Sequence, residues 1–164
     1  MRLFTLTALI VFVLDQASKW LIVHRANLIE LGVIEVWPPF LTFRMGWNRG
    51  INFGLFAHDA EAMRWVLIAV ALAISAFVVV WIARPGHGRL SQIAAGILVG
   101  GAIGNVIDRF LYGAVADFLN MSCCGIENPF VFNVADIAIF AGAFGLAIFG
   151  SDPGKGTPRR RKTP

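Results

Sequence analysis

The sequence has few charged residues, few histidines and only two cysteines. Charged residues make up 15% of its 164 residues, against about 25% in a typical soluble domain, while hydrophobic residues make up 57%. A chain of this length cannot hide so much apolar surface in one core, because small domains bury only a limited share of their area. The composition therefore excludes an ordinary soluble domain and predicts an integral membrane protein.

The two cysteines, Cys123 and Cys124, are adjacent in the sequence. Neighbouring cysteines rarely close a disulfide, because the bridge strains the peptide between them. We therefore expect two free thiols that behave as small hydrophobic residues, and no disulfide framework.

The scarcity of histidine limits the possible chemistry. The three histidines fall between the apolar segments, and there is no His-Glu-x-x-His motif. Zinc sites mostly need nitrogen or sulfur ligands, so we expect no metal and no cofactor. No Gly-x-Ser-x-Gly motif is present either, which argues against a serine hydrolase.

Four segments are apolar enough to cross a bilayer, which takes about 20 residues at 1.5 Å each. They are residues 3–23, 65–83, 90–112 and 130–149. The first follows a basic residue as in a signal peptide, but it continues past Asp15 without a small-residue cleavage signature, so we expect a retained helix. The sequence predicts an all-α membrane protein with four transmembrane helices. We expect one integral membrane domain, residues 1–150, and a basic cytoplasmic tail, residues 151–164.

Basic residues are distributed unevenly between the two sides of this predicted topology. Arg2, Arg84, Arg89 and the basic tail fall on one side, whereas the external loop 24–64 dilutes its arginines with acidic residues. Lysine and arginine favour the cytoplasmic side, so both termini are expected there. The net charge of +4 resides largely in the tail, which suits a membrane surface better than nucleic acid.

The external loop carries a β pattern. Residues 34–37 and 40–47 are rich in β-branched and aromatic side chains, and Phe43, Met45 and Trp47 alternate with polar neighbours. Alternation with period two is typical of a half-buried strand. We expect a small antiparallel sheet between the first and second helices, resting on the outer membrane surface.

Polar residues within the spans gather at one depth, just below the external surface. They are Asp15 and Lys19 in the first span, Asn105, Asp108 and Arg109 in the third, and Asn133 and Asp136 in the fourth. Ionisable residues inside a membrane are costly and mark functional sites by default. Asp15 and Lys19, four residues apart, share a helix face and can pair.

The third span has further features. Its spacing predicts that its three polar residues share one face. Glycines at 96, 100 and 104 form a stripe of small residues that lets a neighbouring helix approach closely. The polar end of this helix is therefore expected to face protein.

Asp117 and Asp136 have no evident cationic partner in their own segments. Two close carboxylates in a poorly hydrated site cannot both ionise, so they share a proton and titrate as a unit. Such a pair can activate a water molecule and protonate a leaving amine, as in aspartic proteases.

Five sequence blocks resemble those of the bacterial lipoprotein signal peptidase family, also called signal peptidase II. They are Asp15-Gln16-Ala17-Ser18-Lys19, Asn48-x-Gly50-x-x-Phe53, Gly101-x-x-Gly104-Asn105-x-x-Asp108-Arg109, Gly113-x-Val115-x-Asp117-Phe118 and Phe132-Asn133-x-Ala135-Asp136. The blocks occur in the family's order. Asn52 and Gly54 depart from the pattern, which leaves the loop's substrate contacts open.

The resemblance implies an aspartic endopeptidase of the bacterial inner membrane, with its active site near the periplasmic face. It would cut the signal peptide from a prolipoprotein before a diacylglyceryl-modified cysteine, and work as a monomer among membrane lipids. Asp117 and Asp136 match the family's catalytic pair. The residues matching its supporting positions are Asp15, Lys19, Asn48, Gly50, Asn105, Asp108, Arg109 and Asn133.

Other interpretations of the same residues stay open at this point. Asp15 and Lys19 can be a structural ion pair between helices. Asn105 and Asn133 can be interhelical hydrogen-bond partners, which are common in membranes. An ion- or proton-coupled transporter would also carry intramembrane aspartates, although the cytoplasmic halves of the four spans are apolar. A non-enzymatic assembly factor would use the polar cluster for packing alone.

Overall fold

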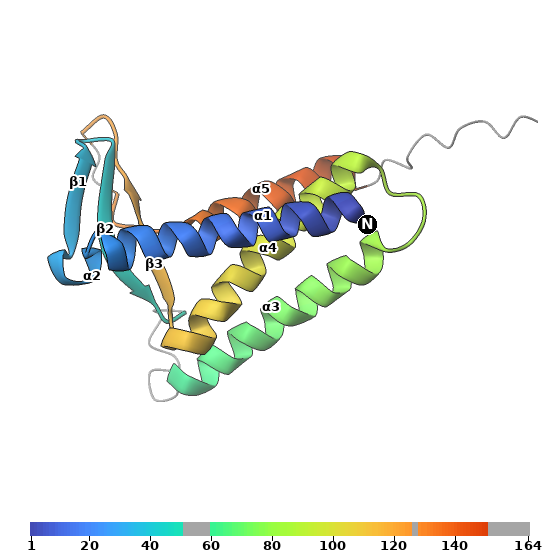
Figure 1. The fold of residues 1–164 in the computed structure, drawn as a ribbon, viewed down its shortest axis with the longest axis horizontal. Coiled ribbons are helices and arrows are strands. Elements are labelled where there is room, and N and C mark those ends of the chain that lie inside the picture. The colour runs from blue at the N-terminus through green and yellow to red at the C-terminus, as the bar shows by residue number, and fades with distance from the viewer. Residues whose placement is uncertain (51–59, 126–127, 151–164) are drawn as a thin grey trace, which may run out of the picture.

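The structure, a computed structural model, describes residues 1–50, 60–125 and 128–150. The elements are α1 (Arg2–Lys19), a π-helical continuation η1 (Trp20–Arg25), α2 (Leu28–Leu31), β1 (Val33–Trp37), β2 (Leu41–Asn48), α3 (Ala60–Ile82), α4 (Arg89–Tyr112), β3 (Val115–Met121) and α5 (Val134–Phe149). The long helices form an elongated bundle with the sheet at one end (Figure 1). The N-terminus and the end of α5 lie at the other end. Phe53, its neighbours Asn52 and Gly54, and the basic tail fall outside the described residues.

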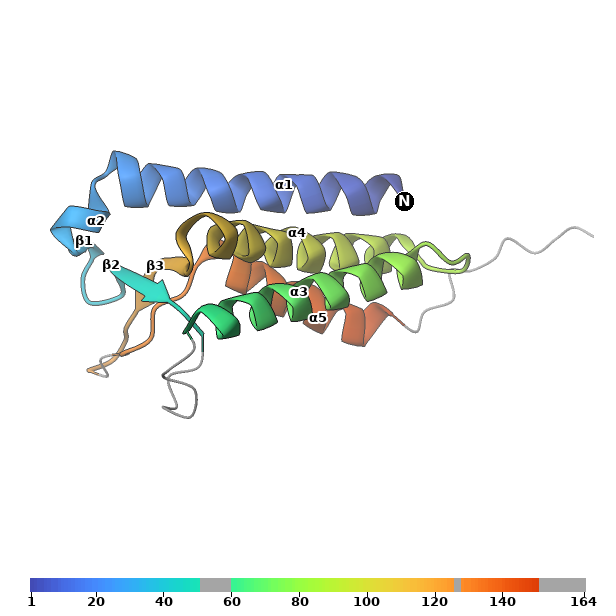
Figure 2. The ribbon, with the colours of Figure 1, turned by 90° about the horizontal axis from the view of Figure 1, so that it is seen from below.

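Helix α4 is the central helix of the bundle, in contact with α1, α3 and α5 (Figure 2). The predicted glycine stripe accounts for the close approach of α1. A Cβ atom at Gly100 would lie 2.5 Å from the carbonyl oxygen of Ala8, and one at Gly96 would lie 2.5 Å from that of Phe4. The expectation that small residues let a helix pack closely here is confirmed.

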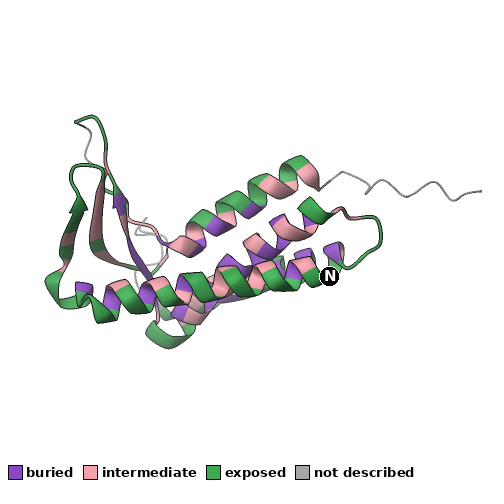
Figure 3. Ribbon diagram, turned by 45° about the horizontal axis from the view of Figure 1, so that its top comes forward, coloured by how far each residue is buried: buried purple, intermediate pink, exposed green. Residues whose placement is uncertain are grey.

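In the part of the chain that the structure describes, three helices are long and apolar enough to cross a membrane: Arg2–Arg25, Glu61–Ile82 and Arg89–Tyr112. Large apolar side chains cover the outside of the bundle, among them Phe77, Phe140 and Phe144, each at least 70% exposed. The buried residues concentrate on α4, whereas the outer faces of the other long helices are largely exposed (Figure 3). An apolar exterior of this kind fits a lipid environment, so the structure agrees with a membrane protein.

The helix in the predicted fourth span begins later than the apolar segment does. Helix α5 starts at Val134, not at residue 130, because Asn133 is its N-cap and the preceding Phe132 forms a bridge with Leu119 of β3. The helix has 16 residues and a length of about 24 Å. It is therefore a shorter apolar helix than the other three.

The sheet is antiparallel with the strand order β1-β2-β3. The first two strands lie where the external loop predicted them. The third strand, β3, was not predicted, so the sheet is not confined to the loop between the first two long helices. Its burial explains the omission: Phe118 is fully buried against Phe43 of β2, and a buried strand shows no alternation of apolar and polar residues.

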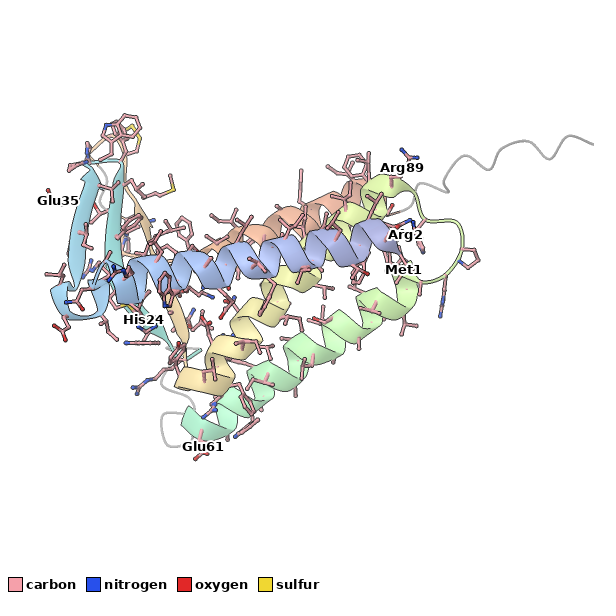
Figure 4. All side chains as sticks on the ribbon, in the orientation of Figure 1. Met1, Arg2, His24, Glu35, Glu61 and Arg89 are labelled. Carbon is pink, nitrogen blue, oxygen red and sulfur yellow. A yellow bond between two sulfur atoms is a disulfide. The ribbon has the colours of Figure 1, made fainter. Side chains whose placement is uncertain are left out.

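Charged residues mark the two ends of the bundle. Arg2 and Arg89 lie at the end remote from the sheet, while Glu35 and Glu61 lie toward the sheet end (Figure 4). At the turn after β3, Cys123 and Cys124 form a disulfide, so the expectation of two free thiols is wrong. Cys124 has a φ of 61°, in the left-handed region.

Candidate active site

Asp117 lies in the middle of β3, opposite Gly46 of β2, and is 3% exposed. It borders a cavity of about 330 Å³ at the sheet end of the bundle. The other residues that line this cavity are Gly46, Trp47, Asn48, Arg49, Gly50, Pro129, Phe130 and Val131. The carboxyl group is thus shielded by protein and reached from one side.

Asp136 lies in the first turn of α5, where it forms a capping box with Asn133. The Asn133 side-chain oxygen accepts a hydrogen bond from the Asp136 backbone N–H (2.9 Å), and the Asp136 Oδ2 accepts one from the Asn133 backbone N–H (3.2 Å). These reciprocal bonds satisfy N–H donors that a helix start leaves without intrahelical partners. They also fix the direction in which the Asp136 carboxyl group points.

Two asparagine side chains connect Asp117 to Asp136. Asn133 donates to Asp117 Oδ1 (2.6 Å) and to Asn105 Oδ1 (3.2 Å), and Asn105 donates to Asp136 Oδ1 (2.8 Å). Four residues from three separate segments therefore form one continuous hydrogen-bonded chain. Asn105 and Asn133 therefore form the hydrogen bonds between segments that the sequence left open. Their partners include both Asp117 and Asp136.

The surroundings of Asp117 favour its protonated form. Burial and, after it, the charge of the nearby Asp136 raise the pKa of this carboxyl group to about 7, although hydrogen bonds from Asn48 and Asn133 act in the opposite direction. A carboxylic acid that holds its proton near neutral pH can share it with a second carboxylate and later donate it.

Lys19 forms ion pairs with two carboxylates rather than one. Its Nζ atom lies 2.8 Å from Asp15 Oδ2 and 2.8 Å from Asp108 Oδ2, and 3.4 Å from Asn105 Oδ1. The pairing of Asp15 with Lys19 is confirmed, and Asp108 joins them across the interface between α1 and α4. All three charged side chains are buried. We call Asp15, Lys19 and Asp108 the buried charge cluster.

The expectation that Asn105, Asp108 and Arg109 share one face of α4 is wrong. Asp108 points to α1, whereas Arg109 lines a groove between α3, α4 and α5, because consecutive residues on a helix are about 100° apart. Asn105 lies between the two and contacts both sides. The Arg109 Nη1 donates to the backbone oxygen of Asn105 (3.3 Å), and its Nε is buried with no partner among the described residues.

The groove beside Arg109 has a volume of about 450 Å³ and is mainly apolar. Its lining residues are Leu67, Val70, Ala71, Ile74, Leu98, Ala102, Asn105, Arg109, Ile139 and Ala143. Its polar lining residues are Asn105, which donates to Asp136, and Arg109. The groove thus leads from the apolar side of the bundle to the hydrogen-bonded chain.

Asn48 and Gly50 lie at the end of β2, on the wall of the Asp117 cavity. The Asn48 side-chain oxygen accepts a hydrogen bond from the Gly50 N–H (3.0 Å), and Gly50 has a φ of 100°, which residues with side chains rarely adopt. This glycine is therefore required by the backbone of the turn.

Two further polar residues belong to the site but were not singled out. Gln16 donates to Asp15 Oδ2 and to Asp108 Oδ1, each over 3.1 Å, and its place next to Asp15 in the first sequence block was a usable signal. Asn120 donates to the backbone oxygens of Asn128 (2.7 Å) and Phe130 (2.8 Å), which holds the wall of the Asp117 cavity. Only the fold reveals the role of Asn120. Within residues 1–50, 60–125 and 128–150, no three His, Cys, Asp or Glu side chains are grouped to hold a metal ion.

Comparison with known proteins shows relatives along almost the whole chain. Residues 7–150 match the family described as Signal peptidase (SPase) II. A lipoprotein signal peptidase of Methylorubrum extorquens is 43% identical over 147 residues, which cover 88% of this chain and 83% of that protein. One of Rhizorhabdus wittichii is 42% identical over 142 residues, covering 86% and 81%.

A solved structure of a bacterial membrane enzyme shares the fold. Its TM-score is 0.74 at 28% identity, and the match covers 88% of this chain and 90% of that one. The sequence and fold matches together favour a membrane peptidase over a transporter or an assembly factor.

Proposed function

The chain belongs to the signal peptidase II family of aspartic peptidases, and on this premise we propose that Asp117 and Asp136 are its catalytic pair. Asp136 takes a proton from a water molecule, and the water oxygen attacks the carbonyl carbon of the scissile peptide bond. Asp117 gives its proton to the developing oxyanion. When the tetrahedral intermediate collapses, the C–N bond breaks and Asp136 gives its proton to the leaving amine. Asp117 takes back a proton from a hydroxyl group of the intermediate, so the pair ends with one shared proton as before.

The observation that carries this proposal is the hydrogen-bonded chain from Asp117 through Asn133 and Asn105 to Asp136. It orients both carboxyl groups from rigid elements, and preorganised polar groups in a shielded site are the main source of catalytic rate. The raised pKa of Asp117 supports its role as the proton carrier. Asp136 receives N–H donors on both oxygens, which fixes the orientation of the carboxyl group assigned as the base.

The two cavities beside the pair suit the two halves of a lipidated precursor. We assign the apolar groove between α3, α4 and α5 to the apolar signal peptide and the acyl chains. The more polar cavity bordered by Asp117 and Arg49 takes the residues that follow the lipidated cysteine. Arg109, with a buried Nε that lacks a partner among the described residues, is placed to bind a substrate carbonyl between the two.

The proposal includes the placement of the enzyme. Four spans cross the bacterial inner membrane, the fourth formed by α5 together with the extended residues before it, and both termini are cytoplasmic. The sheet and the active site then lie at the periplasmic face. Arg2 and Arg89, at the end remote from the sheet, support this orientation. The proposal takes the chain to work as a monomer.

Cleavage of two matched precursor peptides by the purified protein tests the function. One peptide carries a diacylglyceryl group on the cysteine and the other carries an unmodified cysteine. We expect cleavage of the lipidated peptide immediately before the cysteine, little cleavage of the other, and no effect of a chelator. Equal cleavage of both peptides would contradict the assigned substrate, and inhibition by the chelator would contradict the aspartic mechanism.

A further inference from the structure

We propose that Asp15 and Asp108, joined by Lys19, are positioning residues that fix the backbone immediately before each aspartate of the catalytic pair. The inference rests on the proposed roles of Asp117 and Asp136. It assigns the buried charge cluster a function in catalytic geometry, distinct from substrate binding and from helix packing alone.

Asp108 holds the strand that carries Asp117. Its Oδ2 accepts a hydrogen bond from the backbone N–H of Ala116 over 3.2 Å, and the same oxygen is 2.8 Å from Lys19 Nζ. Ala116 directly precedes Asp117 and is 3% exposed, and a buried backbone N–H needs an acceptor such as this carboxylate. The carboxylate of α4 thereby fixes the rotation of the peptide unit from which Asp117 projects.

Asp15 holds the helix that carries Asp136. Its Oδ1 accepts a hydrogen bond from the backbone N–H of Ala135 over 3.0 Å, and its Oδ2 is 2.8 Å from Lys19 Nζ. Ala135 directly precedes Asp136 and is fully buried. Its N–H is one of the donors that the first turn of a helix leaves without an intrahelical partner. Asp15 therefore completes the start of α5 at the residue next to the catalytic position.

Lys19 makes the two contacts interdependent. One ammonium group bonds to both carboxylates, and Gln16 bridges them a second time, so the distance between the two held peptide units is set by a single polar cluster. Burying three charges is expensive, and such clusters add little net stability. Gly104 packs directly against the Asp15 carboxyl group, and a side chain there would displace that carboxyl group. The free-energy cost of burying these three charges is consistent with a role in catalytic geometry rather than in stability.

The cluster does not line the surfaces assigned to the substrate. Asp15, Lys19 and Asp108 are absent from the walls of both the Asp117 cavity and the apolar groove. A defect in the cluster should therefore lower kcat and leave KM nearly unchanged. A misplacement of about 1 Å in a catalytic group can cost roughly 100-fold in rate.

Three variants of the full-length protein separate positioning from a merely structural role. Asp108→Ala removes the acceptor for Ala116, whereas Asp108→Asn keeps an oxygen that can accept from both Ala116 and Lys19. Ser91→Ala is the matched control, because Ser91 donates a buried interhelical hydrogen bond to the Phe149 carbonyl (2.7 Å) at the other end of α4. Steady-state kinetics on the lipidated precursor and hydrogen exchange of the backbone are measured for each variant.

We expect Asp108→Ala to lower kcat at least 10-fold with KM within twofold, Asp108→Asn to recover most of the loss, and Ser91→Ala to keep kcat. Exchange should rise in residues 114–118 of Asp108→Ala but not of Asp108→Asn. An unchanged kcat in Asp108→Ala, or equal losses in all three variants, would overturn the inference. If the wild type cleaves no lipidated precursor, the proposed function fails. The positioning contact is tested separately, because unaltered hydrogen exchange of residues 114–118 in Asp108→Ala would refute it.

Discussion

Asn133 donates a 2.6 Å hydrogen bond from its side-chain amide to Asp117 and at the same time caps the helix that carries Asp136. One residue thus ties the strand β3 to the start of α5. The two polar atoms of this amide have different roles. Its oxygen accepts a hydrogen bond from the Asp136 backbone N–H, and its nitrogen donates one to Asp117. These two tasks can be separated by mutation.

The Asn133→Ser variant should keep stability and lose activity. A serine oxygen can still cap α5, whereas no amide remains to donate to Asp117 and Asn105. We expect a thermal unfolding midpoint close to that of the wild type and a kcat lower by about 10- to 100-fold. Asn133→Ala should lose the cap as well, at a cost of about 1 kcal/mol. Equal activity in the serine variant and the wild type would contradict the assigned role of the amide.

Activity should fall as the pH rises through about 7. Burial and the Asp136 charge raise the pKa of Asp117 to about 7, so its proton is lost above that pH and the pair can no longer protonate the intermediate. The kcat of the wild type, measured from pH 5 to 9, should therefore show an alkaline limb near pH 7. A profile that is flat across this range would contradict the proton-carrying role of Asp117.

The same shift predicts how stability depends on pH. A carboxyl group with a pKa of 3.8 when unfolded and about 7 when folded binds its proton more tightly in the folded state. Stability is therefore lost as the pH rises from about 4 to 7, by an amount on the order of 4 kcal/mol. Asp117→Asn, which does not titrate, should flatten this dependence of the thermal unfolding midpoint. An unchanged slope in the variant would show that other groups cause it.

A side chain on the glycine stripe should separate α1 from α4. The Cβ atom of Gly100→Ala would lie 2.5 Å from the Ala8 carbonyl oxygen and 3.0 Å from its Cα, so the backbone must move. We expect a loss of about 1–3 kcal/mol, measured by thermal unfolding in detergent. Gly88→Ala is the control, because no atom lies within 4 Å of a Cβ at that position. Equal midpoints in the two variants would contradict the close packing.

Filling the apolar groove should weaken substrate binding without changing the chemistry. Ala143 lines the groove, whereas its neighbour Phe144 is 70% exposed on the outside of α5. We expect Ala143→Phe to raise KM for the lipidated precursor several-fold at a nearly constant kcat, and Phe144→Leu to change neither. A drop in kcat alone in Ala143→Phe would show that the groove does not hold the substrate.

The long helices and the first two strands could be predicted from the sequence because each is specified by local composition and periodicity. The glycines at 96, 100 and 104 and the pair formed by Asp15 and Lys19 obey simple helical spacing, and both are found as predicted. The start of α5 could not be predicted in the same way. Residues 130–132 are apolar, but Phe132 bridges β3 instead of continuing the helix.

Contacts between distant segments were harder to predict. The pairing of Lys19 with Asp108 joins two helices, and nothing in the spacing of either helix reveals it. The opposite directions of Asp108 and Arg109 depend on where α1, α3 and α5 pack around α4. The disulfide between Cys123 and Cys124 was not predicted either, because neighbouring cysteines rarely close a bridge.

The most direct test of the account is the single-turnover cleavage rate of a diacylglyceryl-modified precursor by the wild type, Asp117→Asn and Asp136→Asn. Asparagine keeps the shape of each side chain but can neither carry nor accept the shared proton. The account predicts that both variants fold, as judged by their thermal unfolding in detergent, and that each cleaves at least about 1000-fold more slowly than the wild type. Cleavage by either folded variant within 10-fold of the wild-type rate would contradict it.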